Sequence, residues 1–442
     1  MFARRSVIVV GTTTLVVVGS LGAAGAVSPP RAVGWSADHR LTTTYQQPVG
    51  EPGQPQLATN AAGDVASAWR GTDGDAYVAV HDGPGTGWTT PYDLGPSEGG
   101  ELQLGLNAHG RVLVVWVRPV PGDNAGRARV LWAQRPAGGS WSATRRIHTA
   151  TGPYDPYGIS LSVAQTRNGA LAYARNGRAW VQIFAHGTWA APVRMSPRPP
   201  KPKDDTTLGA TDPAVSYDGS GRVRAEWEWV TDGGEGGEIG RTEVGGLSRR
   251  GRPLPVHRVP VPCCAGPYAT AQSRTGQAFA FWNETTYRFE FHLAHGHWFD
   301  YRPPIPSGET SDTATLAVAD DSAYVWWDVR SAHHAAIEEA TYVHGAWSRP
   351  HTIVTAPSGY FLISSAAADP FVSVVGFGLS HSTVSRRRYR AAVWSRFGRT
   401  RRTYRFAPGS GDPDEVAAVA VGGSDAALTW AGHHHSYWAR VH

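Results

Sequence analysis

Short runs of hydrophobic residues, separated by polar and turn-forming segments, recur along this chain, and the clearest example lies between Glu101 and His148. Four runs there have the length of β-strands: Leu102–Leu106, Arg111–Val117, Ala128–Gln134 and Trp141–Ile147. The first three are rich in Val, Leu and Trp, and the segments between the runs contain the Gly, Pro and Asn that favour turns. We predict one four-stranded antiparallel sheet, which must be stacked on further copies to bury its faces and edges.

The same pattern recurs, and a bulky residue marks the end of each predicted second strand: Trp69, Trp116, Tyr173, Trp227, Trp282, Trp326, Phe377 and Trp430. The spacing runs from 44 residues (Trp282 to Trp326) to 57 (Trp116 to Tyr173), which suits four strands without an added helix. We therefore predict an all-β fold, an eight-bladed β-propeller of four-stranded antiparallel blades, with a seven-bladed propeller as the alternative.

A second marker, usually Gly-x-Trp, stands where a fourth strand should begin: Trp88, Trp141, Trp189, Trp298 and Trp347. The fourth and seventh units have GGLSRRGRP and RFGRTRRTY instead. After Trp430 the chain has residues for only one more strand, HSYWARVH. Residues 34–42, GWSADHRLT, match GSWSATRRIH of the second unit, so we expect this N-terminal strand to pair with Ser436–His442 and close the ring.

Residues 1–26 have the pattern of a secretory signal peptide. Arg4 and Arg5 precede the apolar run Val7–Val18, and Ala24-Gly25-Ala26 offers small residues for cleavage. Sec-type export fits better than twin-arginine export, and the run is shorter than the ~20 residues of a membrane span. We expect a secreted, extracellular protein whose residues 27–442 form a single propeller domain, monomeric and without stable membrane insertion after cleavage.

Composition narrows the class of partner. The chain has 52 glycines, 32 prolines and 18 tryptophans, which suits an all-β fold rich in turns. Its net charge of +5 is spread thinly, and the one dense basic run is Arg386-Arg387-Arg388 with Arg390. Because no nucleic-acid-binding motif appears, we expect no nucleic-acid partner.

The two cysteines, Cys263 and Cys264, are adjacent. Exported thiols tend to be oxidised, and pairing within the chain would form a vicinal disulfide. The Cα atoms of neighbouring residues stand about 3.8 Å apart, below the usual disulfide range, so such a ring is strained. We favour the vicinal disulfide over reduced or intermolecularly paired cysteines.

In a propeller, the loops that join blades open on one face, and here those loops are irregular and acidic. Twelve acidic residues gather in them: Glu51, Glu98, Glu101, Asp155, Asp204, Asp205, Asp212, Glu309, Asp312, Asp412, Asp414 and Glu415. This acidic rim could hold Ca²⁺, bind sugars together with tyrosines, or supply a carboxylate pair for glycoside hydrolysis. The alternative is a solvated rim that keeps the ring soluble.

Three consecutive blade-joining loops supply the candidate ligand-binding residues: Tyr154, Asp155, Tyr157, Asp212, Cys263, Cys264 and Tyr268. Asp155 and Asp212 are the catalytic candidates if the protein is an enzyme. The histidine runs, His333-His334 and His433-His434-His435, lack the spacing of a zinc motif, so we assign no metal ligands and no cofactor, with Ca²⁺ left open.

The repeat, with NAAGDVASAW, NAHGRVLVVW and then GxxW, resembles the secreted β-propeller proteins of actinobacteria with sialidase-like or WD-like repeats. The resemblance covers the whole mature chain and implies a fold more than an activity. Sialidases carry the motif Ser-x-Asp-x-Gly-x-Thr-Trp, from which the nearest stretch, residues 216–221, departs after the aspartate. They also use an arginine triad, and none can be assigned among Arg70, Arg118, Arg175 and Arg330.

The sequence therefore favours a non-catalytic propeller that binds a carbohydrate or another extracellular polymer through its irregular face. A glycoside hydrolase of sialidase-like or lyase-like type, using the rim carboxylates, is the second interpretation. A structural or protein-binding ring is the third. Fold alone does not choose among them.

Overall fold

The computed structural model describes residues 39–40 and most of residues 56–441. The gaps within the second range are 61, 72, 84–85, 98–101, 121–127, 151–157, 164–167, 198–208, 218–221, 233–237, 260–268, 273–278, 284–287, 293–297, 312, 320, 332, 357–359, 370–371, 381–389, 398–399, 406–414, 423–424 and 433–434. The signal sequence predicted for residues 1–26 lies outside the described residues. No helix in the described part of the chain is long and apolar enough to cross a membrane.

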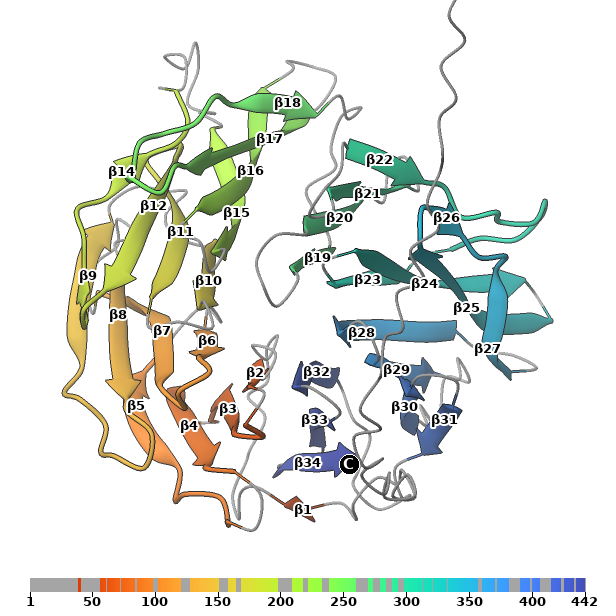
Figure 1. The fold of residues 1–442 in the computed structure, drawn as a ribbon, viewed down its shortest axis with the longest axis horizontal. Helices are drawn as coiled ribbons and strands as arrows, with labels where there is room; N and C mark the ends of the chain where they lie inside the picture. Colours follow the sequence, from red (N-terminus) through yellow and green to blue (C-terminus); the bar gives the residue numbers. More distant parts are fainter. Residues whose placement is uncertain are drawn as a thin grey trace, which may run out of the picture. The chain divides into compact units, whose positions relative to one another are not determined.

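The described strands form antiparallel sheets, of which the first four come from residues 56–259 (Figure 1). The first sheet contains β2 (Gln56–Thr59), β3 (Val65–Arg70), β4 (Asp75–His81) and β5 (Tyr92–Pro96). The second contains β6 (Leu102–Leu106), β7 (Val112–Pro119), β8 (Ala128–Arg135) and β9 (Arg145–Ala150). The third contains β10 (Ile159–Val163), β11 (Gly169–Arg175) and β12 (Arg178–Ala185), with β13 (Thr188–Trp189) and β14 (Val193–Arg194) both paired to β12. The fourth contains β15 (Ala210–Tyr217), β16 (Val223–Asp232), β17 (Glu238–Leu247) and β18 (His257–Val259).

Four more sheets follow in the same order of strands. The fifth contains β19 (Ala269–Gln272), β20 (Phe279–Asn283), β21 (Arg288–His292) and β22 (Trp298–Tyr301). The sixth contains β23 (Ala314–Ala319), β24 (Ser322–Ser331) and β25 (His334–Val343), with β26 (Ala346–Trp347) and β27 (His351–Ala356) both paired to β25. The seventh contains β28 (Tyr360–Asp369), β29 (Val372–Ser380), β30 (Arg390–Phe397) and β31 (Thr400–Arg405). The last contains β32 (Glu415–Gly422), β33 (Asp425–Gly432), β34 (His435–Val441) and β1 (His39–Arg40).

The all-β fold and its antiparallel four-stranded sheets agree with the sequence prediction, and the boundaries in the second sheet test it in detail. Its first strand is Leu102–Leu106, as predicted, but the fourth begins at Arg145 and not at Trp141. The Trp141 ring instead stacks on Tyr92 of the first sheet, with ring centroids 5.3 Å apart and an interplanar angle of 16°. The marker tryptophan therefore fills the space between two sheets before the strand starts.

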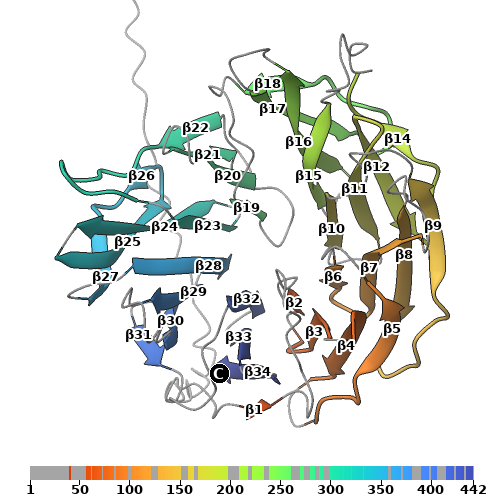
Figure 2. The same ribbon diagram turned by 180° about the vertical axis from the view of Figure 1, so that it is seen from behind.

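First strands of successive sheets lie against one another (Figures 1 and 2). These contacts run from β19 to β23, β28 and β32, and from β32 through β2, β6 and β10 to β15. Between β15 and β19, no comparable contact exists among the described residues. All of these strands belong to one compact unit, Trp35–His442.

β1 pairs antiparallel with β34, with His39 opposite Trp438 and Arg40 opposite Tyr437. The last sheet thus receives its fourth strand from the beginning of the chain, at the place the sequence pattern indicated. Trp35, which the sequence also placed in this strand, lies outside the described residues. Closure of the whole arrangement into a ring remains a prediction.

The core consists of the layers between neighbouring sheets. The marker residues Trp116, Tyr173, Trp227 and Trp326 are each 0% exposed. Trp116, for example, belongs to one apolar cluster with Leu102 and Leu104 of β6 and with Val78 and Val80 of β4 in the neighbouring sheet. Close packing of large rings between sheets is what makes the bulky marker recur in the sequence.

The turns between first and second strands are held by asparagine. In the first two sheets, the Oδ1 atoms of Asn60 and Asn107 accept hydrogen bonds from the amides two and four residues further on, at 2.9–3.0 Å. Gly63 and Gly110 in these turns have φ of 83° and 71°, which glycine adopts without strain. Asn60 Nδ2 also donates to the Asn107 carbonyl at 2.9 Å and so joins the two turns. These hydrogen bonds give the two turns a structural role.

Candidate functional site

Six of the seven predicted binding residues lie outside the described residues: Tyr154, Asp155, Tyr157, Cys263, Cys264 and Tyr268. The vicinal disulfide therefore stays a prediction. The seventh residue, Asp212, belongs to β15, where the backbone is described. The register against β16 shifts between Thr211 and Ala214, so Asp212 lies in a β-bulge near the start of the strand. Register shifts of this kind are frequent beside functional sites.

Two hydrogen bonds relate β15 to the neighbouring first strand, β10. The amides of Val215 and Tyr217 donate to the hydroxyls of Ser160 and Ser162, at 3.1 and 3.0 Å. Because both partners advance by two residues, the two strands run parallel. Their first residues, Ile159 and Ala210, therefore lie at the same end of the two sheets.

Most of the acidic rim lies in the gaps. Glu309 is described and is half-buried, and Glu415 is described by its backbone in β32. The other predicted rim residues apart from Asp212 lie outside the described residues: Glu51, Glu98, Glu101, Asp155, Asp204, Asp205, Asp312, Asp412 and Asp414. The acidic rim remains a prediction.

The described histidines form no metal site. His333 and His334 are exposed at the turn between β24 and β25. Within the described ranges, no three His, Cys, Asp or Glu side chains come together in an arrangement that could hold a metal ion. His433 and His434 lie outside those ranges, and His435 begins β34. This result does not test whether the acidic rim binds Ca²⁺.

A groove of about 660 Å³ lies on the fourth sheet. Its lining residues come from the start of β16, the end of β17 and the segment before β18: Arg222, Val223, Arg224, Val244, Gly245, Ser248, Arg249, Arg250, Leu254 and Pro255. We call it the arginine groove. Four of its ten lining residues are arginines and none is acidic, so it is a cationic surface of the size of a small-ligand site.

The arginine groove opens at the opposite end of the sheet from Asp212. β15 ends at Tyr217, which pairs with Val223 at the start of β16, and Val223 in turn pairs with Leu247 at the end of β17. First-to-second strand turns lie at this end of the sheets, and in the first two sheets asparagine hydrogen bonds hold them. The GGLSRRGRP segment, which stands in place of Gly-x-Trp, is the sequence signal for the groove, but its charge could not be assigned to a surface without the sheet.

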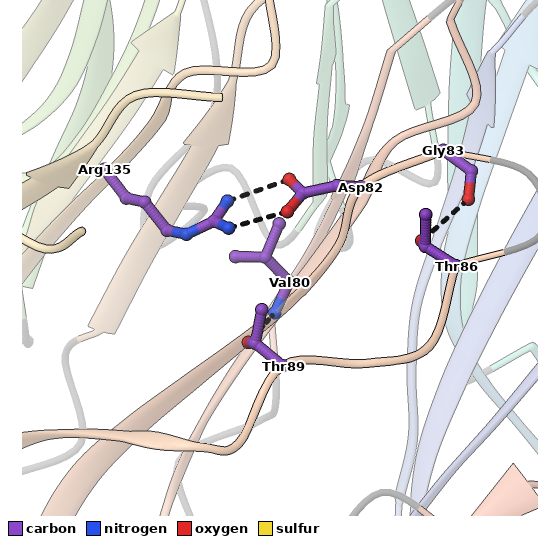
Figure 3. A network of polar contacts seen from close by, with 6 residues as sticks. All are labelled: Val80, Asp82, Gly83, Thr86, Thr89 and Arg135. Carbon is purple, nitrogen blue, oxygen red and sulfur yellow. Dashed lines mark hydrogen bonds and ion pairs between the residues drawn. The ribbon is translucent and has the colours of Figure 1, made fainter. Parts of the chain in front are cut away.

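A second group of charges is structural (Figure 3). Arg135, the last residue of β8, donates from Nη1 and Nη2 to the two carboxylate oxygens of Asp82, at 2.8 and 2.6 Å. Asp82 follows β4, so this bidentate pair joins the first and second sheets. The Arg135 hydrogen bond is the main cause that lowers the pKa of Asp82. The arginine side chain is 7% exposed and the aspartate 29%. Both terminal nitrogens of the Arg135 guanidinium bind Asp82, so the pair stabilises the contact between the first and second sheets.

Buried glutamates accompany two marker tryptophans. Trp227 Nε1 donates to Glu243 Oε2 at 3.1 Å, and Glu243 stands opposite Trp227 across β16 and β17. In the sixth sheet, Glu339 stands opposite Trp326 in the same way. Both glutamates are 2% exposed. Their positions within the core place them away from any surface at which a ligand could reach them.

The chain matches no protein-family model and no curated protein. It is similar in structure to an ulvan lyase, described as a new family of polysaccharide lyase and bound to a fragment of glucuronate and sulfated rhamnose. That likeness has a TM-score of 0.50 and 13% identity over 84% of this chain and 97% of that one. A prolyl endopeptidase gives the same TM-score and identity over 86% of this chain, which spans about half (52%) of that protein. The β-propeller domain of the trilobed protease from Pyrococcus furiosus has 8% identity and a TM-score of 0.43 over 80% of this chain and 96% of that domain. At these identities the likeness concerns the fold alone.

Proposed function

We propose that the protein is a secreted, non-catalytic, eight-bladed β-propeller that binds a carbohydrate, or another extracellular polymer, through the loops that enter its first strands. β1 supplies the outermost strand of the last blade and so closes the ring. The binding sector consists of the segments before β10, β15 and β19, with Tyr154, Asp155, Tyr157, Asp212 and Tyr268 as its principal residues.

The parallel arrangement of β10 and β15 is the observation that carries the proposal. Tyr157 precedes β10 by two residues, and Asp212 lies near the start of β15. The hydrogen bonds Val215–Ser160 and Tyr217–Ser162 bring both strand starts to one end. The loops that enter β10 and β15 can therefore form one surface, and such loops on a rigid scaffold are common binding sites. The segment before β19 is included as the next blade-joining loop along the chain.

The residue types in these loops suit a sugar. Tyrosine rings offer flat apolar faces with a polar edge, and ionised aspartates accept hydrogen bonds from hydroxyl groups. Aromatic faces and carboxylates together recognise a polyhydroxylated ring without a covalent step. Cys263 and Cys264, as a vicinal disulfide, would add a rigid apolar surface in the same sector.

Retention of the mature protein, residues 27–442, on a panel of immobilised polysaccharides tests this function. We expect retention on at least one polysaccharide, and Tyr157→Ala and Asp212→Asn should each weaken it about tenfold, since each removes one stacking or hydrogen-bonding group. Asp300→Asn, which alters an exposed carboxylate of β22, is the matched control and should bind as the wild type.

The same panel separates binding from catalysis. Release of reducing or unsaturated sugar ends that Asp155→Asn or Asp212→Asn abolishes would show an enzyme and contradict the non-catalytic proposal. Retention on none of the polysaccharides would contradict carbohydrate binding itself. N-terminal sequencing of the exported protein should begin at Val27, and recovery of uncleaved protein in the membrane would contradict secretion.

A further inference from the structure

We propose that the arginine groove is a second binding site, which holds the sulfate or carboxylate groups of an acidic polysaccharide. The groove lies at the opposite end of the fourth sheet from Asp212, so this inference does not depend on the proposed binding sector. It rests on the charge of the groove, on how its backbone is held, and on the way this sheet departs from the repeat.

The charge at the groove comes from two directions. Arg222 and Arg224 flank Val223 at the start of β16, while Arg249 and Arg250 stand in the turn that follows β17. Arg222, Arg249 and Arg250 are exposed. The exposed Arg249 and Arg250, on a concave surface whose ten lining residues include no acidic one, favour a local positive potential in a protein whose net charge is only +5.

The turn that carries Arg249 and Arg250 is fixed by its backbone. The Ser248 amide donates to the Arg252 carbonyl and the Gly251 amide to the Ser248 carbonyl, both at 2.8 Å. The Arg252 amide donates to the Ser248 hydroxyl at 3.1 Å. Gly251 has a φ of 71°, which closes the turn. The Cα positions of both arginines are therefore set before any ligand arrives, which lowers the ordering cost of binding.

The floor of the groove is equally constrained. The Leu254 amide donates to the Gly246 carbonyl at 2.8 Å, which holds the chain after the turn against β17. A Cβ atom at Gly246 would stand 2.3 Å from the Val223 carbonyl oxygen, so only glycine fits there. The side chain of Leu254 is 41% exposed and gives the groove one apolar wall.

The fourth sheet departs from the repeat pattern at the turn that carries Arg249 and Arg250. In the third and sixth sheets, the turn after the third strand leads to a marker tryptophan, Trp189 or Trp347, that packs on that sheet. In the fourth sheet, a longer turn brings Pro253 opposite Leu247 and places Ser248, Arg249 and Arg250 between them. Pro253, opposite Leu247, takes the place that Trp189 has opposite Phe184, and Arg249 and Arg250 are exposed in the longer turn before it.

The chemistry of the lining points to an oxyanion on a sugar chain. Guanidinium groups pair in a bidentate manner with planar or tetrahedral oxyanions, and they stay charged at any physiological pH. The lining has no aromatic ring on which a nucleic-acid base could stack, whereas Leu254 and Pro255 can contact the apolar face of a pyranose. A volume of about 660 Å³ accommodates more than one sugar unit.

Binding of the mature protein to four probes tests the proposal: dextran sulfate, polygalacturonate, neutral dextran and a DNA duplex of similar length, by affinity electrophoresis at about 20 mM salt, where charge interactions are little screened. We expect binding to dextran sulfate or polygalacturonate. The double variant Arg249→Gln/Arg250→Gln should weaken it at least about tenfold, because two charged hydrogen-bond donors are lost. The charge-matched double variant Arg302→Gln/Arg349→Gln, at exposed positions after β22 and β26, should bind as the wild type.

The outcomes are separable. Binding of both sulfated and carboxylated probes, lost in the groove variant alone, supports the proposal, and the ratio of the two affinities identifies the preferred group. Absence of binding to either probe overturns it, as does equal weakening in the control variant, which would show a diffuse charge effect. Tighter binding of the DNA duplex with the same dependence on Arg249 and Arg250 overturns the choice of polysaccharide. Tyr157→Ala and Asp212→Asn should leave groove binding unchanged, so failure of the proposed binding sector remains distinguishable.

Discussion

Single residues join the sheets by more than apolar contact, and the pair Asp82–Arg135 shows how. Its guanidinium is almost buried between the first two sheets and has both carboxylate oxygens as partners. An ion pair of this kind contributes little relative to a well-packed apolar pair. Loss of one partner is costly, however, because it leaves the other charge buried without compensation.

Asp82→Asn is therefore expected to lower the free energy of unfolding by roughly 1–3 kcal/mol. Urea unfolding followed by tryptophan fluorescence measures it. The control is Asp300→Asn, which removes an ion pair with Arg288 at 3.2 Å in which both side chains are about half exposed. That change should stay within about 0.5 kcal/mol. Equal effects of the two variants would contradict a structural role for the Asp82 pair.

The depressed pKa of Asp82 adds a dependence on pH. A carboxylate whose folded pKa lies below its unfolded value, about 3.9, stabilises the fold above that value and loses this contribution as the pH falls through the folded pKa. The difference in unfolding free energy between wild type and Asp82→Asn should thus be constant near neutral pH and shrink below about pH 4. A difference that grows on acidification would show that another group is responsible.

At the scale of elements, the hydrophobic pattern located most strands because each inner strand is a short apolar run between turn residues. The predicted strand Leu102–Leu106 agrees with β6 residue for residue. Its bounds were clear in the sequence because most residues of β6 are buried and apolar. The fourth strand was placed too early, since Trp141 was assigned to it. The contact that decides its place, with Tyr92 of the preceding sheet, lies outside the local sequence.

The candidate sites, too, could be located from the sequence only in part. The sequence placed Asp212 in the loop that leads into a first strand, whereas the backbone has it as the third residue of β15. At the opposite end of the sheets, Asn60, Asn107 and the glycines beside them satisfy their own backbone, and the sequence indicated no site there. It could not foresee that Arg222 and Arg249 share one concave surface. That proximity arises from the hairpin register, in which Val223 pairs with both Tyr217 and Leu247.

Glycine substitutions test how the fourth sheet is built. Gly246→Ala should lower the free energy of unfolding by about 1–3 kcal/mol, because its Cβ would meet the Val223 carbonyl oxygen, which is backbone and cannot rotate away. Gly251→Ala meets no atom but sits at a φ of 71°, so about 1 kcal/mol is expected. Gly87→Ala has neither obstacle and serves as the control. Thermal unfolding of the three variants ranks their stabilities. A Gly246→Ala variant as stable as the wild type would contradict the packing described for the groove floor.

On the scale of the whole molecule, the last sheet is completed by a segment almost four hundred residues away in the chain. The pairs His39–Trp438 and Arg40–Tyr437 are the described part of this contact. Pairing of distant segments is slow to form, because a long loop must close before the contact stabilises it. Once formed, it gives the last sheet its fourth strand.

Removal of residues 27–42 from the mature protein tests this contribution. We expect the free energy of unfolding to fall by roughly 2 kcal/mol, since strand pairing is lost along the edge of β34. Removal of residues 27–33 alone leaves the pairing strand in place and should have no effect. Equal stability of the two truncated proteins, measured by urea unfolding, would show that the N-terminal strand does not hold the last sheet.

The broken outer strands of the third and sixth sheets bear on how the protein behaves at high concentration. β13 and β14 are separate short segments with Pro192 between them, and Pro350 separates β26 from β27. Proline has no amide hydrogen, and the break leaves no continuous ladder for a foreign strand to extend. We expect each interruption to hinder fibril growth from the periphery of a protein whose described elements are all β-strands.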